Sequence, residues 1–300
     1  MMLRGALLLA AIAFSFCTGL QAAQTYAARG LVLKIDKAHR SVTVSCEEIP
    51  KYMEAMVMSF RVKNSKELDG LGVGTMIEFT LVVAEKSAYV EGIRVRQYQA
   101  IEQDPLAARR LKLISGIVDS EGAPKEIETG ERVPDFKLVD QNGRSVTLWQ
   151  YSGKVVVLTF TYTHCVLPNF CFRNSNNFRL LQKRFSNRMG KDLILMTITF
   201  DPVHDTPDVL AIYGKTWSAD SNNWKLLTGN PADISAVAER FGMSYWFDEG
   251  LMNHSLHTVI IDRNGRMAAK LEGNEYSADE LGDVVLTVLE HTETHNVHHP

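Results

Sequence analysis

Two cysteines near the middle of the chain, Cys165 and Cys171, have the setting of a reactive or metal-binding pair. They follow an apolar run at residues 155–162, which is typical of a buried strand, and precede a segment whose apolar residues recur with helical spacing. A helix N-terminus facing a strand end lowers the pKa of a nearby thiol and favours the thiolate, the form that binds metals or attacks. We therefore predict that Cys165 and Cys171 form a soft metal site or a redox-active dithiol. The alternative is a structural role, as a disulfide or as two buried thiols.

A second sulfur-rich segment lies nearer the N-terminus, where Met53, Met56 and Met58 account for three of the eleven methionines. Met56 and Met58 are two residues apart in a segment with strand character, so their thioethers are expected on one face. Thioethers are soft ligands that bind Cu(I), whereas packing in a core is the commoner role of methionine. From these residues alone, both interpretations stay open.

The composition excludes several classes of protein. The 300 residues include 32 Lys and Arg and 35 Asp and Glu, a net charge of -3, so the chain lacks the basic excess typical of nucleic-acid binding. Four cysteines are too few for a disulfide-stabilised scaffold, and a hydrophobic share of 45% is ordinary for a globular chain with a core. The length suggests about two domains.

The N-terminal residues 1–23 have the features of a signal peptide. Arg4 precedes an apolar run at residues 6–16, and small residues follow it. An uncleaved membrane anchor over residues 5–23 is one alternative, because that uncharged segment is just long enough to span a bilayer. Lipidation of Cys17 is the other. All three interpretations place the rest of the chain outside the cytoplasm. In an oxidising compartment, the three remaining cysteines, an odd number, imply at least one free, reactive or metal-bound thiol.

Residues 24–98 are predicted to form a small β-barrel of the OB type. Their apolar residues alternate or are β-branched in five short segments separated by turn residues. Five strands in about 70 residues fit such a barrel. The pattern is lost in residues 99–127, which we interpret as a linker with one short helix. The expected strands cover residues 30–36, 40–46, 56–62, 76–83 and 88–95.

Residues 128–290 are predicted to form an α/β domain of the thioredoxin type. The runs 155–162 and 193–200 are almost continuously apolar, as expected for strands covered on both faces. A helix is expected to begin at Thr206 and Pro207, and a hairpin and a last helix at 278–291 follow.

The last ten residues, 291–300, form a histidine-rich tail. Such tails bind Cu(II), Ni(II) or Zn(II) loosely, and a disordered polar end is the alternative. The four histidines are His291, His295, His298 and His299.

Several motifs in residues 128–290 resemble the Sco/SenC family of thioredoxin-like copper proteins, in that family's order. In the family two cysteines and one histidine bind copper, so the resemblance implies Cys165, Cys171 and His254 as ligands. Two thiolates and one imidazole make a soft site of the kind that selects copper. An exposed loop position is the alternative for His254. The motifs are GERVPDF at 130–136, GKVVV at 153–157, FTYTHC at 160–165, DPVHDTP at 201–207 and NHS at 253–255.

The cysteine spacing departs from the family pattern, which is usually CxxxC rather than CxxxxxC. Residues six apart on a helix are about 240° apart around its axis, so Cys165 and Cys171 cannot share one face of a regular helix. A loop containing Pro168 is therefore predicted between them, and it can still bring both sulfurs to one ion. His164 is expected to point away from Cys165, and His257 is expected to pack on a strand.

Residues 27–97 resemble the small CusF-like periplasmic copper-binding domain, a five-stranded barrel. That family shows a pattern close to HxxIPxxxMPxMxMxF, in which Met53, Met56, Met58 and Phe60 fall in place and Cys46 takes the histidine position. The resemblance implies Met56 and Met58 as copper ligands, with Met53 or Cys46 as further partners.

These observations lead to one main hypothesis, a periplasmic copper chaperone. The small domain would capture Cu(I) through its methionines, and the second domain would hold copper through Cys165, Cys171 and His254 and deliver it to a partner. The family resemblance implies the CuA centre of a cytochrome c oxidase as that partner. One alternative is an enzyme, a thiol–disulfide reductase acting through the two cysteines. The other is a copper-buffering protein for metal resistance.

Overall fold

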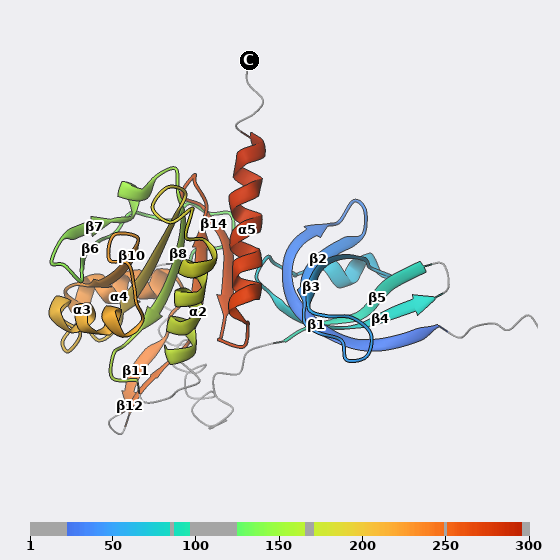
Figure 1. Ribbon diagram of the computed structural model, residues 1–300, viewed down its shortest axis with the longest axis horizontal. Helices are drawn as coiled ribbons and strands as arrows, with labels where there is room; N and C mark the ends of the chain where they lie inside the picture. Colours follow the sequence, from blue (N-terminus) through green and yellow to red (C-terminus); the bar gives the residue numbers. More distant parts are fainter. Residues whose placement is uncertain (1–22, 85–86, 97–124, 166–170, 249–250, 296–300) are drawn as a thin grey trace, which may run out of the picture.

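The computed structural model describes residues 23–84, 87–96, 125–165, 171–248 and 251–295 of the chain (Figure 1). The first 22 residues of the predicted signal peptide, most of the predicted linker, Pro168 and the end of the tail lie outside these residues. A β-barrel and an α/β domain lie side by side, and the long C-terminal helix stands between them (Figure 1). Within the described ranges, no helix is both long and apolar enough to cross a membrane.

The N-terminal domain is a five-stranded antiparallel sheet with the order β3-β2-β1-β4-β5. The sheet curls on itself, because Val62, just after β3, forms a bridge with Val90 of β5. The predicted five-stranded fold is confirmed, although β1 begins earlier than expected. The strands are β1 (Gln24–Asp36), β2 (Ser41–Cys46), β3 (Met56–Arg61), β4 (Met76–Ala84) and β5 (Ser87–Val95), with the 3-10 helix η1 (Ser65–Leu68) before β4.

The second domain is built on a seven-stranded mixed sheet with the order β14-β13-β8-β9-β10-β6-β7. β8, β9 and β10 are parallel, and the other neighbours are antiparallel. The predicted thioredoxin-like α/β architecture is confirmed. The strands are β6 (Lys137–Asp140), β7 (Ser145–Thr147), β8 (Val155–Thr161), β9 (Leu193–Thr199), β10 (Trp224–Thr228), β13 (His257–Ile261) and β14 (Met267–Glu272).

Helices cover both faces of this sheet. Val157 and Leu195 belong to a core shared with α2, α3 and α5, whereas Leu158 and Met196 belong to a second core shared with α4. All residues of β8 and β9 are buried, which explains why their sequences lack polar alternation. The helices are α2 (Cys171–Arg184), α3 (Pro207–Thr216), α4 (Pro231–Arg240), α5 (Ala278–His295) and the 3-10 helix η2 (Leu148–Tyr151), and a two-stranded ribbon is formed by β11 (Tyr245–Asp248) and β12 (Leu251–His254).

Helix boundaries follow the capping signals of the sequence with one difference. Thr206 caps α3 by accepting a hydrogen bond from the Val209 N–H, and Pro207 is its first residue, as predicted. α5 runs to His295, beyond its predicted end at His291, so residues 292–295 are helical instead of part of the predicted tail.

A packed interface joins the barrel to the second domain. Along β1, Val32 points into the barrel core, whereas Leu31 and Leu33 enter the second domain's core beside β14 and α5. The Ser45 hydroxyl donates to the Asp283 carboxylate at 2.7 Å across the same boundary. The middle of β1 is therefore buried on both faces, and this packing fixes the position of the barrel.

Replacing Leu31 with alanine is expected to loosen this interface. Leu31 is 1% exposed, and loss of a buried leucine side chain lowers the free energy of unfolding by about 2–5 kcal/mol. The two domains should then unfold in urea in two separate transitions. The transitions can be told apart because tryptophan fluorescence follows only the second domain, which holds all four tryptophans, while circular dichroism follows both domains. Val57→Ala, at a barrel position that is 49% exposed, is the control. If the fluorescence and circular dichroism transitions of Leu31→Ala coincide at the urea midpoint of the parent protein, Leu31 does not hold the two domains together.

Candidate metal centre

Cys165 and Cys171 lie together where the sheet of the second domain ends. β8 ends at Thr161, and Cys165 follows in a turn in which its N–H donates to the Tyr162 carbonyl at 3.4 Å. Cys171 is the first residue of α2, and its thiol shares a hydrogen bond with the Cys165 thiol. Both thiols are buried, and the two cysteines form no disulfide. The sulfur atoms therefore meet despite the CxxxxxC spacing, because only one of the two cysteines lies on the helix.

His254 brings an imidazole to this thiol pair. It is the last residue of β12, where it pairs with Tyr245 of β11, and its Nε2 lies 3.8 Å from the Cys171 sulfur. Its Nδ1 lies 2.8 Å from the Ser255 carbonyl oxygen, which can only accept a hydrogen bond, so Nδ1 carries the proton. The Nε2 lone pair therefore faces the sulfur, which is the tautomer that a metal-binding histidine needs.

The separation of 3.8 Å between these two atoms suits donors around one ion. With metal–sulfur and metal–nitrogen bonds of about 2.3 and 2.0 Å at an angle of about 120°, the donors would lie about 3.7 Å apart. In the described part of the chain, no three His, Cys, Asp or Glu side chains are close enough to hold an ion as they stand. The side chains of Cys165, Cys171 and His254 must therefore rearrange for all three to bind one ion.

The pKa of the Cys171 thiol is raised well above its usual range. The hydrogen bond to the Cys165 thiol is the largest cause, followed by burial and by repulsion from Cys165. The expectation of a lowered pKa is therefore wrong for Cys171, because burial beside a second thiol outweighs the effect of the helix start. A metal binds thiolates, so its binding must displace protons from this pair.

Aromatic side chains surround the imidazole. The ring of His254 lies 4.6 Å from Phe200 and 5.7 Å from Tyr162 between centroids, and Phe200 stacks on Tyr245 at 5.4 Å. Burial, together with the nearby Cys165, raises the pKa of Tyr162, so its phenol stays protonated. These rings were not predicted as part of the site, although Tyr162 and Phe200 are the last residues of the two apolar runs.

Asp205 ties the cysteine-bearing turn to the loop after β9. Its fully buried carboxylate accepts hydrogen bonds from the Thr163 N–H at 3.1 Å, from the Thr163 hydroxyl and from the Thr199 hydroxyl at 2.5 Å. Hydrogen bonds to a charged acceptor are stronger than neutral ones. The turn that carries Cys165 is therefore held against the end of β9.

Two further histidines take the positions expected for them. His164 points into solvent, away from the buried Cys165, with 68% of its side chain exposed. His257 is buried on β13, where desolvation lowers its pKa to about 3. His257 is therefore neutral and packs in the sheet.

The predicted methionine site occupies the edge strand β3. Met56 lies opposite Cys46 and Met58 lies opposite Val44 in the register with β2, so the three sulfur-bearing residues share one face. Met56 is 51% exposed, whereas Cys46 is buried and Met58 is half-buried against the barrel core. Met53 lies before β3 and packs against the same core.

The start of β3 borders a cleft of about 690 Å³ between the two domains. Met56 and Cys46 line its barrel side, and Arg173, Arg184 and Glu280 line the side of the second domain. Burial, with repulsion from nearby carboxylates, raises the pKa of Cys46 to about 11. The more exposed thioether of Met56 is therefore the sulfur that an entering ion meets first.

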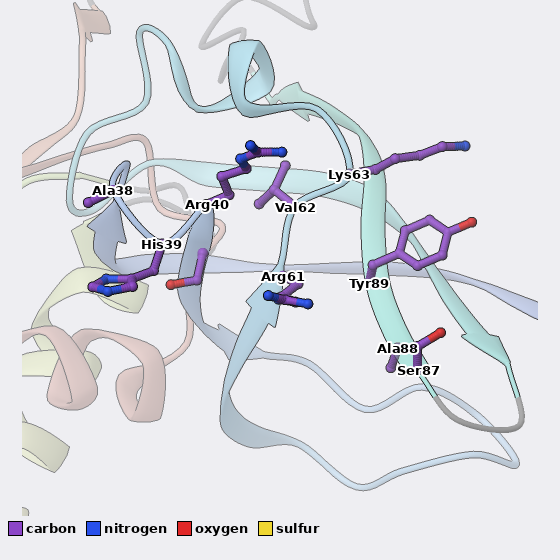
Figure 2. A pocket seen from close by; sticks show the side chains of 10 residues that line it. Ala38, His39, Arg40, Arg61, Val62, Lys63, Ser87, Ala88 and Tyr89 are labelled. Carbon is purple, nitrogen blue, oxygen red and sulfur yellow. The ribbon is translucent and has the colours of Figure 1, made fainter.

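A second hollow, of about 780 Å³, lies at the opposite end of β3. Figure 2 shows Arg40, Arg61 and Lys63 around it, with His39 at one end. The residues that line it include no cysteine or methionine. It therefore offers no soft ligand, and its cationic side chains repel metal ions.

Two family models match the chain, one for each domain. The SCO1/SenC model matches residues 124–290, and the model of the copper binding periplasmic protein CusF matches residues 25–95. Both resemblances noted from the sequence motifs are therefore confirmed.

Individual relatives match the second domain. A SCO2-like protein of Rickettsia typhi is 31% identical over 140 residues, which are 44% of this chain and 65% of that protein. The mitochondrial SCO1 homolog 1 of Arabidopsis thaliana is 26% identical over 156 residues, which are 50% of this chain and 45% of that protein. The crystal structure of Arabidopsis thaliana ScoI with copper bound has 25% identity and a TM-score of 0.48, and the match covers 54% of this chain and 99% of that chain.

The chain spans less than two thirds of the length of these two curated relatives. The SCO1/SenC match covers more than half of the chain, and the CusF match precedes it. The chain therefore belongs to the SCO1/SenC family and carries a CusF-type domain at its N-terminal side.

Proposed function

We propose that this protein is a periplasmic copper chaperone that holds Cu(I) between Cys165, Cys171 and His254. One observation carries the proposal, the 3.8 Å between the Cys171 sulfur and a His254 Nε2 whose lone pair faces it. Membership of the SCO1/SenC family and the copper-binding description of the CusF family support the choice of metal.

The side chains of this site would bind the ion, orient it and keep water away. Thiolates and a neutral imidazole are donors that select copper over harder cations such as Mg²⁺. The hydrogen bond from Nδ1 to Ser255 fixes the direction of the imidazole lone pair. The rings of Tyr162 and Phe200 shield the imidazole, so few water molecules can compete for the ion.

The proposed second Cu(I) site lies on the barrel, formed by Met56 and Met58 with Cys46 or Met53 as a third ligand. The shared face of β3 and β2 supports this set, and so does the match to the CusF family. The match to the periplasmic protein CusF, together with the predicted signal peptide, also supports a periplasmic location. A copper-accepting protein such as the CuA subunit of cytochrome c oxidase is the proposed partner, which rests on family membership.

A thiol–disulfide reductase is the second candidate function. The observation that favours it is the hydrogen bond between the thiols of Cys165 and Cys171, which form no disulfide in this structure and could be oxidised to one. In that case the pair would exchange with the cysteines of a partner instead of holding copper.

Cys165→Ser and Cys171→Ser are each expected to remove tight Cu(I) binding, because a hydroxyl is a poor ligand for a soft ion. In competition with a chromophoric Cu(I) chelator, affinity should fall by more than about 100-fold, exceeding the loss typical of outer-shell partners. Cys46→Ser is the control and should leave the tightest site intact. Unchanged affinity in either main-site variant would remove that cysteine from the ligand set.

His254→Ala is expected to separate the two candidate functions. The Cu(I) affinity should fall by about 100-fold, because one of three donors is lost. The rate of exchange with a small aromatic disulfide should stay within about threefold, because both thiols remain. Equal losses in copper affinity and exchange rate would favour the reductase.

Met56→Leu and Met58→Leu, combined in one variant, are expected to lower the Cu(I) stoichiometry from two to one. Leucine keeps the volume and the barrel packing but removes the thioether, at a cost below about 1.5 kcal/mol. Met76→Leu, in β4 of the same barrel, is the matched control. Metal analysis after gel filtration gives the stoichiometry, and two bound ions in the double variant would contradict the barrel site.

A further inference from the structure

Two exposed histidines stand side by side near the thiol pair. His164 follows β8 and immediately precedes Cys165, whereas His204 lies in the loop after β9. Their ring centroids are 6.0 Å apart and the rings are nearly perpendicular. Their side chains are 68% and 60% exposed, so both rings are open to solvent. The two cysteines of the proposed Cu(I) site, in contrast, are buried.

A carboxylate orients one of these imidazoles as in a metal site. The Nδ1 of His204 lies 2.9 and 3.0 Å from the two carboxylate oxygens of Asp201. Asp201 is itself held, because its N–H donates to the Thr199 hydroxyl at 3.0 Å. Carboxylate–histidine pairs of this kind fix the tautomer of metal-binding histidines and raise their basicity. The Nε2 lone pair of His204 is therefore available to an ion.

The second imidazole also directs its Nδ1 toward the protein. The Nδ1 of His164 lies 3.4 Å from the Thr163 hydroxyl and 4.0 Å from the buried carboxylate of Asp205. Its Nε2 is therefore left for a ligand. Asp201 and Asp205 place two negative charges beside the rings, which attract a cation to this position.

The separation of the rings fits one shared ion. An ion bound at about 2.0 Å by an imidazole nitrogen lies about 3.2 Å from the ring centroid, so two rings sharing an ion are about 5.2 Å apart at a tetrahedral angle and about 6.4 Å apart when opposite each other. The observed 6.0 Å lies between these limits. Because both side chains are exposed, His164 and His204 can rotate toward a shared ion without disturbing the packed core.

We propose that His164 and His204 form a surface site for a divalent cation, with Cu(II) as the preferred ion and water completing its coordination. Imidazole nitrogen suits Cu(II), and Cu(II) binds such donors more tightly than Ni(II) or Zn(II). This site differs from the Cu(I) site in its ligands, its exposure and the oxidation state it selects. It would hold Cu(II) one residue away from the thiol pair.

The test uses the full chain with competing ligands removed. The background carries Cys165→Ser and Cys171→Ser, and glutamine replaces the tail residues His291, His295, His298 and His299. Cu(II) is titrated against glycine as a competitor, and electron paramagnetic resonance follows the bound ion. One equivalent with nitrogen hyperfine coupling is expected. His164→Gln and His204→Gln should each weaken binding by at least about 10-fold, and Asp201→Asn should weaken it by about 10-fold.

His39→Gln is the matched control. His39 is also exposed and its Nδ1 lies 2.8 Å from a carboxylate oxygen of Asp36, three residues away, but Figure 2 shows no second imidazole among the residues of its hollow. Its replacement should leave Cu(II) affinity unchanged. Equal affinities for the parent and His204→Gln, or an equal loss in His39→Gln, would overturn the proposal. Circular dichroism confirms that each variant is folded.

A separate measurement distinguishes this site from the Cu(I) site. In the chain with both cysteines present, His164→Gln and His204→Gln should leave Cu(I) affinity unchanged. A loss of Cu(I) affinity would show that these histidines belong to the thiol site and would overturn the proposal of a separate one. Conversely, absence of Cu(I) binding with Cu(II) binding retained would contradict the proposed function and leave the imidazole pair standing.

Discussion

The pairing of β8 with β9 is the constraint on which both proposed sites of the second domain depend. The two strands run parallel in register from Val155 and Leu193 to Thr161 and Thr199, so their carboxyl ends stop side by side. The chain after β8 carries the cysteine turn and the chain after β9 carries the loop with Asp205. Hydrophobic burial on both faces holds the strands together, and the Asp205 carboxylate then joins the two segments that leave them.

His254 reaches the same edge by a different route. β13 pairs with β8 in the antiparallel direction, so the chain that enters β13 arrives where β8 ends. The ribbon of β11 and β12 delivers His254 just before that entry, and Phe200 and Tyr162 support the ring from the ends of the two apolar runs. The sheet thus brings Cys171 and His254 together, although they are more than eighty positions apart in the chain.

Most elements that follow from the burial of apolar residues could be predicted from the sequence. Features that depend on contacts between distant residues mostly could not. The runs at 155–162 and 193–200 were identifiable because strands buried on both faces need continuous apolar residues, and α3 because Thr206 and Pro207 mark a helix start. β10 and the ribbon of β11 and β12 were not predicted, because short segments show too few periods for a pattern to emerge. α4 was missed although Asn230 and Pro231 give the same kind of helix-start signal as Thr206 and Pro207. The raised pKa of Cys171 could not be predicted either, since it depends on a neighbouring thiol that only the fold brings close.

The placement of Cys46 opposite Met56 likewise depends on strand register, which local residues do not determine when a long turn joins two strands. Met56 and Cys46, which this register pairs, both line the cleft between the domains.

The two proposed copper sites differ in charge, and this difference sets a direction between them. Thioethers are neutral, whereas the thiols of Cys165 and Cys171 must release protons to bind a metal. The thiolates that then form carry negative charge and would attract Cu(I) more strongly in a buried site. Six carboxyl groups and three guanidinium groups line the cleft, so it would attract a cation toward Met56. Because Leu31 and Leu33 pack the barrel against the second domain, capture and tight binding would occur on one folded unit. Once the thiols have released their protons, charge would therefore favour movement of Cu(I) from the barrel to the thiolates, and the reverse movement would cost the attraction that the thiolates supply.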